Sequence, residues 1–299
     1  MNCGNCANPT PICQDHVCVA CERRDQCASD EICYEGRCQA CDVTCQAGTC
    51  SNADLLAAIG SAAPGGTVYI CPGRYTGLIV PAKDVSLVGA GSGEATTAET
   101  VLDAAGAGRV IDIPQDLTVG LHQLRITGGY IQDTQGGAGI RHAGRLLTMT
   151  DCTVVNNVTE MTQNIVPVRG TIINGSASRL EMTRCTVRNN RVGIYLGYEA
   201  RTLGGGIYNA NELVMSDCVI RDNTTKSDGG GLFNYSGSAT LTNCRITRNT
   251  LTEPGLDPGG GVLAKGGPVT LENCYVWDNL PSDCSGTVTG SDCGVTPPS

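Results

Sequence analysis

The chain is poor in large aromatic residues and in basic charge. It has one phenylalanine and one tryptophan among 299 residues, against 40 glycines. Most globular cores contain several large aromatic side chains, so this composition favours a narrow aliphatic core with many tight turns. The formal net charge is -9. This lack of a basic excess argues against nucleic acid and anionic membrane surfaces as partners.

Long apolar runs are also missing. No stretch of 18 consecutive apolar residues occurs, so we expect no insertion into a membrane. Residues 1–3 do not open a signal peptide, and we expect a leader to precede the mature chain. Nineteen cysteines, eleven of them within the first fifty residues, predict an oxidising location, extracellular or at the cell surface.

One sequence pattern occurs five times between residues 137 and 279. Each copy is centred on a cysteine, with Leu or Met three residues before it, Val or Ile two after it and Asn five after it, and glycines precede each copy. The cysteines recur every 26 to 33 residues, a period typical of a solenoid. The repeated residues are Cys152, Cys185, Cys218, Cys244 and Cys274, with Asn157, Asn190, Asn223, Asn249 and Asn279.

The spacing within each copy indicates which kind of solenoid forms. Apolar residues alternate in twos around the cysteine, as in short strands, while Gly and Asn fall where the chain must turn. We therefore predict an all-β chain whose residues 50–294 form a single-stranded parallel β-helix, with each copy as one rung. Because stacking places like residues on like, the five cysteines should form an internal ladder, and the five asparagines a hydrogen-bonded ladder at a turn.

Residues 1–49 are predicted to be a separate module. Ile12-Cys13 leads to Cys18-Val19-Ala20-Cys21, and Ile32-Cys33 leads in the same register to Cys38-Gln39-Ala40-Cys41, so a short unit is duplicated. A unit with so few apolar residues must be stapled, which favours disulfides. The two Cys-x-x-Cys pairs also fit a zinc ribbon, but Cys27 and Cys33 would have no role in a four-ligand site.

The segments that flank the repeats are predicted to close the solenoid. Asn52 or Ser51 can cap a short helix that carries Leu55, Leu56 and Ile59 on one side and plugs the open end. We expect Cys50 to pair with Cys71 and clamp this cap to the first rung, and Cys284 to pair with Cys293 at the other end. Residues 295–299 are predicted to be a tail or linker.

These residues resemble the right-handed parallel β-helix of the pectate-lyase-like superfamily. The cap and the segment from Gly65 to Tyr75 are similar to that family's first rung, and Leu87 to Gly91 to its second. Ile220-x-x-Asn223 followed by three glycines resembles the polymorphic outer-membrane-protein repeat. The cysteines at both ends resemble bacterial secreted proteins of the CSLREA type. The resemblance implies a right-handed β-helix with an N-terminal cap, a fold that hosts lyases, hydrolases, epimerases and noncatalytic adhesins alike.

Catalytic patterns are missing from the sequence. The pectinase set Asn-Thr-Asp, Asp-Asp, Gly-His-Gly and Arg-x-Lys does not occur, and no outward column of acids recurs on successive copies, as a calcium-dependent lyase or a hydrolase would need. One residual cluster could form a carbohydrate groove, although ordinary loop surface is the more common explanation. Its members are Asp133, Arg141, His142, Arg169, Glu199 and Arg201, with Tyr195 and Tyr198 as stacking platforms.

We expect a secreted or surface-displayed scaffold without catalysis, serving adhesion or contact with a polysaccharide or a surface protein. The alternative is a polysaccharide lyase or glycoside hydrolase that acts on an acidic polysaccharide through the loops around residues 133–203. We expect no metal and no cofactor, calcium being the one ion left open. Self-association through the ends or edges of the solenoid is a further option.

Overall fold

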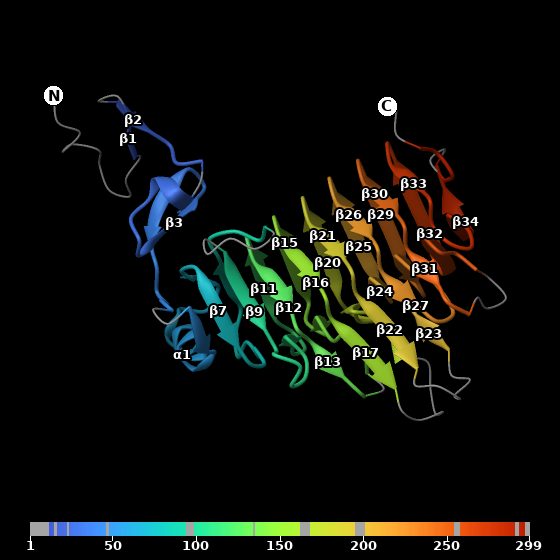
Figure 1. The fold of residues 1–299 in the computed structure, drawn as a ribbon, viewed down its shortest axis with the longest axis horizontal. Coiled ribbons are helices and arrows are strands. Elements are labelled where there is room, and N and C mark those ends of the chain that lie inside the picture. The colour runs from blue at the N-terminus through green and yellow to red at the C-terminus, as the bar shows by residue number, and fades with distance from the viewer. Residues whose placement is uncertain are drawn as a thin grey trace.

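The computed structural model describes residues 12–14, 17–22, 24–45, 48–93, 99–133, 135–161, 168–194, 201–253, 258–290 and 293–296. Figure 1 shows the strands stacked side by side along the long axis, with α1 (Ala53–Ser61) near one end and β33 (Tyr275–Trp277) and β34 (Cys284–Thr289) at the other. Strands of the solenoid pair in parallel with the equivalent strand of the next rung. The predicted all-β parallel β-helix is confirmed.

The solenoid has three faces, which the chain visits in turn. The first face contains β6 (Gly66–Tyr69), β8 (Val85–Val88), β11 (Thr118–His122), β15 (Leu146–Thr150), β20 (Arg179–Thr183), β25 (Glu212–Ser216), β29 (Ser238–Thr242) and the second half of β32 (Val262–Glu272). The second face contains β5 (Thr49–Ser51), β7 (Gly73–Thr76), β9 (Thr100–Asp103), β12 (Arg125–Thr127), β16 (Thr153–Val155), β21 (Thr186–Arg188), β26 (Val219–Arg221), β30 (Arg245–Thr247) and β33.

The third face contains β10 (Ile111–Ile113), β14 (Ile140–His142), β19 (Ile172–Asn174), β24 (Ile207–Asn209), β28 (Leu232–Asn234) and the first half of β32. Because β32 runs through a corner without a break, it joins the first and third faces into one sheet. Short strands between the second and third faces are β13 (Tyr130–Ile131), β17 (Val158–Met161), β22 (Arg191–Ile194), β27 (Thr224–Thr225), β31 (Thr250–Leu251), β18 (Val168–Arg169) and β23 (Thr202–Leu203).

Like residues stack on like inside the solenoid. On the first face, Leu147 pairs in register with Leu180 and Leu213, and two residues further on Met149 pairs with Met182 and Met215. These side chains are at most 1% exposed. They belong to one continuous core that runs from Val43 to Val276. A single rung could not bury them, so stability arises from stacking.

The five repeat cysteines line the core as free thiols. Each is at most 1% exposed, and neighbours contact one another, as where the backbone N–H of Cys185 donates to Sγ of Cys218 at 3.3 Å. Hydrogen bonding to the Cys185 thiol, followed by burial, raises the pKa of Cys218 to about 12. Since the thiolate is the reactive form, these cysteines are inert packing residues.

The five repeat asparagines form a buried ladder at the turn after the second face. The side-chain amide of each donates to Oδ1 of the next at 2.9–3.1 Å, and so does the backbone N–H at 3.0–3.1 Å. The backbone N–H of Gly129 donates to the first member, Asn157, and the last, Asn279, donates to Asp283. Every donor along this turn therefore has a partner away from water.

The glycines that precede the third face lie against this ladder. A Cβ placed on Gly231 would meet the carbonyl oxygen of Gly261 at 2.7 Å and the side-chain nitrogen of Asn249 at 3.0 Å. Gly206 is confined in the same way by Gly231 and Asn223. The two repeated features are therefore one structure, in which the buried amide occupies space that only glycine leaves free.

The duplicated N-terminal unit folds as two antiparallel hairpins. They are β1 (Ile12–Gln14) with β2 (Val17–Val19), and β3 (Glu31–Tyr34) with β4 (Arg37–Ala40), separated by the 3-10 helix η1 (Arg24–Gln26). Cys13 lies opposite Cys18 as Cys33 lies opposite Cys38. Disulfides join Cys21 to Cys33 and Cys27 to Cys38. Sulfurs of Cys21, Cys27 and Cys38 lie within 4.8 Å of one another, but bonded as disulfides they are not thiolates that could hold zinc.

The predicted bond between Cys50 and Cys71 is wrong. Cys71 pairs with Cys41, and Cys50 pairs with Cys45. The duplication explains this, because Cys21 follows the first hairpin and is bonded to Cys33 of the second unit. Cys41 is the equivalent residue after the second hairpin. Since no third unit follows, Cys41 is bonded to Cys71 of the first rung.

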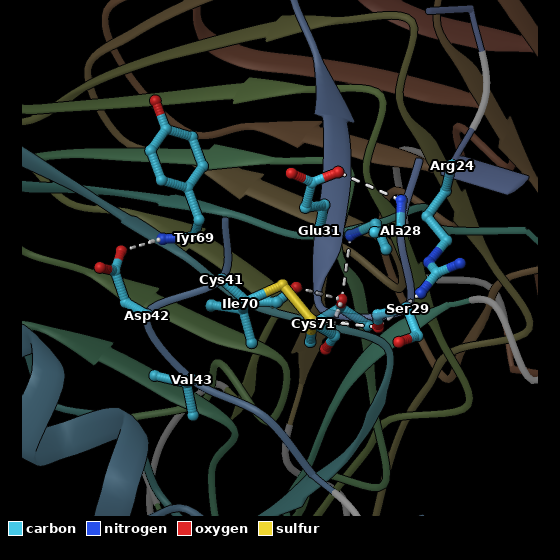
Figure 2. The surroundings of a disulfide bond; sticks show 12 residues. Arg24, Ala28, Ser29, Glu31, Cys41, Asp42, Val43, Tyr69, Ile70 and Cys71 are labelled. Carbon is cyan, nitrogen blue, oxygen red and sulfur yellow. Dashed lines mark hydrogen bonds between the residues drawn. A yellow bond between two sulfur atoms is a disulfide. The ribbon is translucent and has the colours of Figure 1, made fainter. Parts of the chain in front are cut away.

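Figure 2 shows how this bond fixes the module to the solenoid. Around the Cys41–Cys71 sulfurs, the backbone N–H of Tyr69 donates to Asp42 at 2.8 Å. Tyr34 of the second hairpin packs on Tyr69 and His122 of the first face, with ring centroids 6.1 and 5.8 Å apart. The module is thus attached by this disulfide, by backbone hydrogen bonds between Asp42, Val43 and the first rung, and by an aromatic contact.

Both ends of the solenoid are closed. At the first end, α1 buries Leu55 and Ile59 against the core; Asn52 stands at its N-cap, but its side chain donates to Leu78 instead of the helix. At the other end β34 pairs with β32, and Cys284 is bonded to Cys293 as expected.

The buried cysteine ladder makes a prediction about stability. Replacing Cys218 with Asp should lower the free energy of unfolding by about 3 kcal/mol or more, because a carboxylate would be buried without a partner. Replacing it with Ala should cost only about 1–2 kcal/mol, through a small cavity. Chemical denaturation of both variants tests this, and equal tolerance of the two would show that position 218 is not buried.

Candidate functional site

The outer surface of the third face carries one continuous row of side chains. Ile111 and Ile113 point into the core, so the residue between them points outward, and the parallel register repeats this on each rung. We call this the outer row. It consists of Asp112, Arg141, Ile173, Tyr208, Phe233 and Leu263.

The first end of the outer row is an ion-pair network. Arg141 binds both carboxylate oxygens of Asp112 at 2.8 Å. Arg109 contacts Asp112 and Asp133, each at 3.3 Å, and donates to the carbonyl oxygens of Gly136 and Gly137. Gln135 accepts from Arg141. Two of the predicted site residues, Asp133 and Arg141, therefore share one network, and each of its carboxylates already has a guanidinium partner.

The other end of the outer row is aromatic. Tyr208 and Phe233 are 4% and 1% exposed, whereas Tyr235, just beyond the strand, is 50% exposed. The three rings lie nearly parallel, with centroids 5.7–6.3 Å apart. Cζ of Arg169 lies 5.4 Å from the centre of the Tyr208 ring, a cation–π contact. Burial raises the pKa of Tyr208, so this stack is uncharged apart from Arg169.

His142 does not belong to this surface. It follows Arg141 on β14, and strand alternation turns it inward, where it is fully buried. Its Nε2 lies 3.0 Å from the carbonyl oxygen of Arg179, and no partner reaches Nδ1 among the described residues. Burial lowers its pKa to about 4. The prediction that His142 lines a groove is wrong, because a side chain inside the solenoid cannot meet a polymeric ligand.

His142 instead stands one rung before a second amide ladder, which the sequence reasoning missed. In register it pairs with Asn174, which pairs with Asn209 and then Asn234. Asn174 donates to Asn209 at 2.7 Å and Asn209 to Asn234 at 2.6 Å. The signal was present, since each of these asparagines stands three or four residues after a glycine of the repeat.

The remaining predicted residues are not brought into one groove. Arg201 is held by Asp228, whose side chain is fully buried, at 2.7 Å. The guanidinium of Arg169 lies over the Tyr208 ring, and among the described residues no ion pair or side-chain hydrogen bond joins it to the network of Asp133 and Arg141. Tyr195, Tyr198 and Glu199 lie outside the described residues. Among the described residues, each carboxylate of the network at the first end of the outer row is therefore bound by a guanidinium.

Comparison with protein families agrees with this architecture. Residues 169–295 match a family model described as a right handed beta helix region. The matched part includes the aromatic end of the outer row. No curated protein matches the chain.

Two further observations bear on location. Five disulfides occur among the described residues, which indicates an oxidising environment. No helix in the described part of the chain has the length and hydropathy needed to cross a membrane.

The buried imidazole makes stability depend on pH. In the unfolded chain, His142 takes up a proton below about pH 6.5, whereas in the folded chain its lowered pKa keeps it neutral until about pH 4. Because protonation then favours the unfolded state, the free energy of unfolding decreases as the pH falls from about 6.5 to about 4. His142→Asn, which matches the residue type of the second amide ladder, should remove this loss. Urea unfolding at pH 7 and 4.5 should show a gain for the variant of about 2–3 kcal/mol at the lower pH relative to the higher. The same pH dependence in both proteins would contradict it.

Proposed function

We propose that this chain is a noncatalytic scaffold, secreted or displayed at a cell surface, that binds carbohydrate or protein through Tyr235 and the exposed surface around the aromatic end of its outer row. The observation that supports this most directly is the half-exposed ring of Tyr235, which lies on the buried rings of Phe233 and Tyr208. A ring supported from behind loses little conformational freedom on binding, and aromatic side chains with a polar tip are favoured at binding surfaces.

The state of the polar groups supports binding over catalysis. A lyase needs a base free to take a proton, and a hydrolase needs two carboxylates that face the bond to be cut. At the first end of the outer row, Asp112 and the neighbouring Asp133 both face Arg109, and His142 is inside the core. Hydrogen bonds from Arg109 and to Asp133 also hold Gly136 and Gly137 against the sheet and so give the row a fixed shape.

The fold supplies the rigidity that such a role requires. Each rung is joined to the next by parallel strand pairing, the amide ladders and a shared core. In a solenoid, the surface of one face becomes an extended platform along which a long ligand can lie.

The proposal predicts that Tyr235 matters for binding. On an array of glycans and candidate surface proteins, the full chain should bind a subset, and Tyr235→Ala should weaken that binding by tenfold or more. Tyr235→Phe keeps the ring and should retain most of the affinity. Leu280→Ala, which removes another exposed apolar side chain, 59% exposed, is the matched control and should bind as the parent does.

Incubation with uronic-acid polymers tests the catalytic alternative. We expect no unsaturated or shortened products from any polymer in the panel. Sustained turnover that is lost when Arg141 or Arg109 is replaced would overturn the scaffold proposal and assign a lyase or hydrolase activity to the network.

A further inference from the structure

A second group of side chains stands out on the second face, at the C-terminal end of the solenoid. On β33, Val276 is fully buried in the core, so Tyr275 and Trp277 on either side of it point outward, and both are partly exposed. The register places Arg245 beside Tyr275 and Thr247 beside Trp277. We call these four residues the end platform.

Arg245 differs from the other arginines nearby. Arg248 is bound by Asp222 at 2.8 Å, and Arg221 contacts the same carboxylate at 2.5 Å. Arg184, one corner away, is held by both oxygens of Asp151. Arg245 is exposed, and among the described residues no hydrogen bond or ion pair engages its guanidinium. On a chain with a net charge of -9, it is a cation that its surroundings leave unneutralised.

Thr247 provides an independent sign of an incomplete site. Its residue is 4% exposed, and its hydroxyl oxygen is buried with no hydrogen-bond partner among the described residues. A buried polar group without a partner is costly and calls for an explanation such as a bound ligand or water. The hydroxyl lies on the outward side of β30, between Arg221 and Trp277 in register.

We propose that the end platform binds an acidic oligosaccharide strand, one that carries carboxylate or sulfate groups. Flat aromatic rings offer large contact area to the C–H faces of sugar rings at low cost in side-chain entropy. A guanidinium free of intramolecular partners can take a carboxylate or sulfate in a bidentate contact. Tyr275 and Trp277 are about 7 Å apart along one strand, so the site has the form of an extended track suited to a linear chain. This site is separate from the outer row of the third face and does not depend on it.

The platform contains its own reporter, because Trp277 is the one tryptophan of the chain. The full chain should be titrated at low ionic strength with dextran sulfate, polygalacturonate, unmodified dextran and polyglutamate while the tryptophan emission is followed. We expect a saturable change with one or both acidic polysaccharides, weakened by added salt, and tenfold weaker or no response to dextran and polyglutamate. An equal response to polyglutamate would overturn the assignment to saccharide, and an equal response to dextran would overturn the role of charge.

Substitutions separate the contributions of the platform residues. Arg245→Gln and Tyr275→Ala should each weaken the acidic polysaccharide by tenfold or more, while Trp277 still reports binding in both. Arg184→Gln is the matched control, since its guanidinium is already engaged by Asp151, and it should bind as the parent does. Tyr235→Ala on the third face should also leave the tryptophan response unchanged.

Melting temperatures of the variants show whether each is folded. A folded Arg245→Gln protein that binds as tightly as the parent would overturn the proposal, as would the absence of any emission change with both acidic polymers. Binding that fails only in Tyr235→Ala would assign the ligand to the outer row and reject the end platform. If the outer row proves inactive while the end platform responds, the proposed function fails and this inference stands.

Discussion

The structure depends on the hydrogen bonds between side-chain amides that repeat along the inside of one corner. Neighbouring rungs of a parallel sheet are about 4.8 Å apart, and an asparagine at the same place on each rung can satisfy both its own amide and the backbone of the turn. The column from Asn157 to Asn279 does this while 0–5% exposed. Because the column excludes side chains from the adjacent turn, it requires the glycines beside it. Core packing of Leu, Met and Cys then follows at fixed register, and a slip by one residue would break all of these contacts together.

That rigid register determines how the surface is used. Outward residues also stack on equivalent positions of neighbouring rungs, so charged side chains lie next to charged side chains and aromatic rings next to aromatic rings. On the third face this yields the network of Arg109 and Asp112 at one end and the stack of Tyr208, Phe233 and Tyr235 at the other. The polar groups at the first end neutralise one another, which fixes the shape of the surface there.

Much of the fold could be predicted from the sequence, because each rung of a solenoid repeats the same spacing of residues. The interval of five residues from cysteine to asparagine spans one strand and one corner, and the stacking of equivalent residues gives the register between rungs. The orientation of His142 could have been found in the same way, since it stands where Asn174 and Asn209 stand on later rungs. The partner of Cys71 could not, because Cys50 and Cys41 are both candidates until the hairpins are placed. The residues before each ladder asparagine, such as Asp222 and Arg248, are corners with positive φ. Four of the five are Asn or Asp, which adopt this conformation more readily than other residues with a side chain.

The first amide ladder also has a direction. The Oδ1 of each asparagine accepts from the N-terminal side, and its Nδ2 donates to the next acceptor of the ladder on the C-terminal side. The same Nδ2 also donates to a backbone carbonyl of the preceding rung. The series starts at a backbone N–H, that of Gly129, and ends on the carboxylate of Asp283, which can accept but cannot pass a donor onward. Asp283 therefore ends the ladder, because a carboxylate at this position, unlike an amide, cannot donate to a further rung. If an insertion added a rung to the solenoid, the acidic residue would have to follow the new last asparagine.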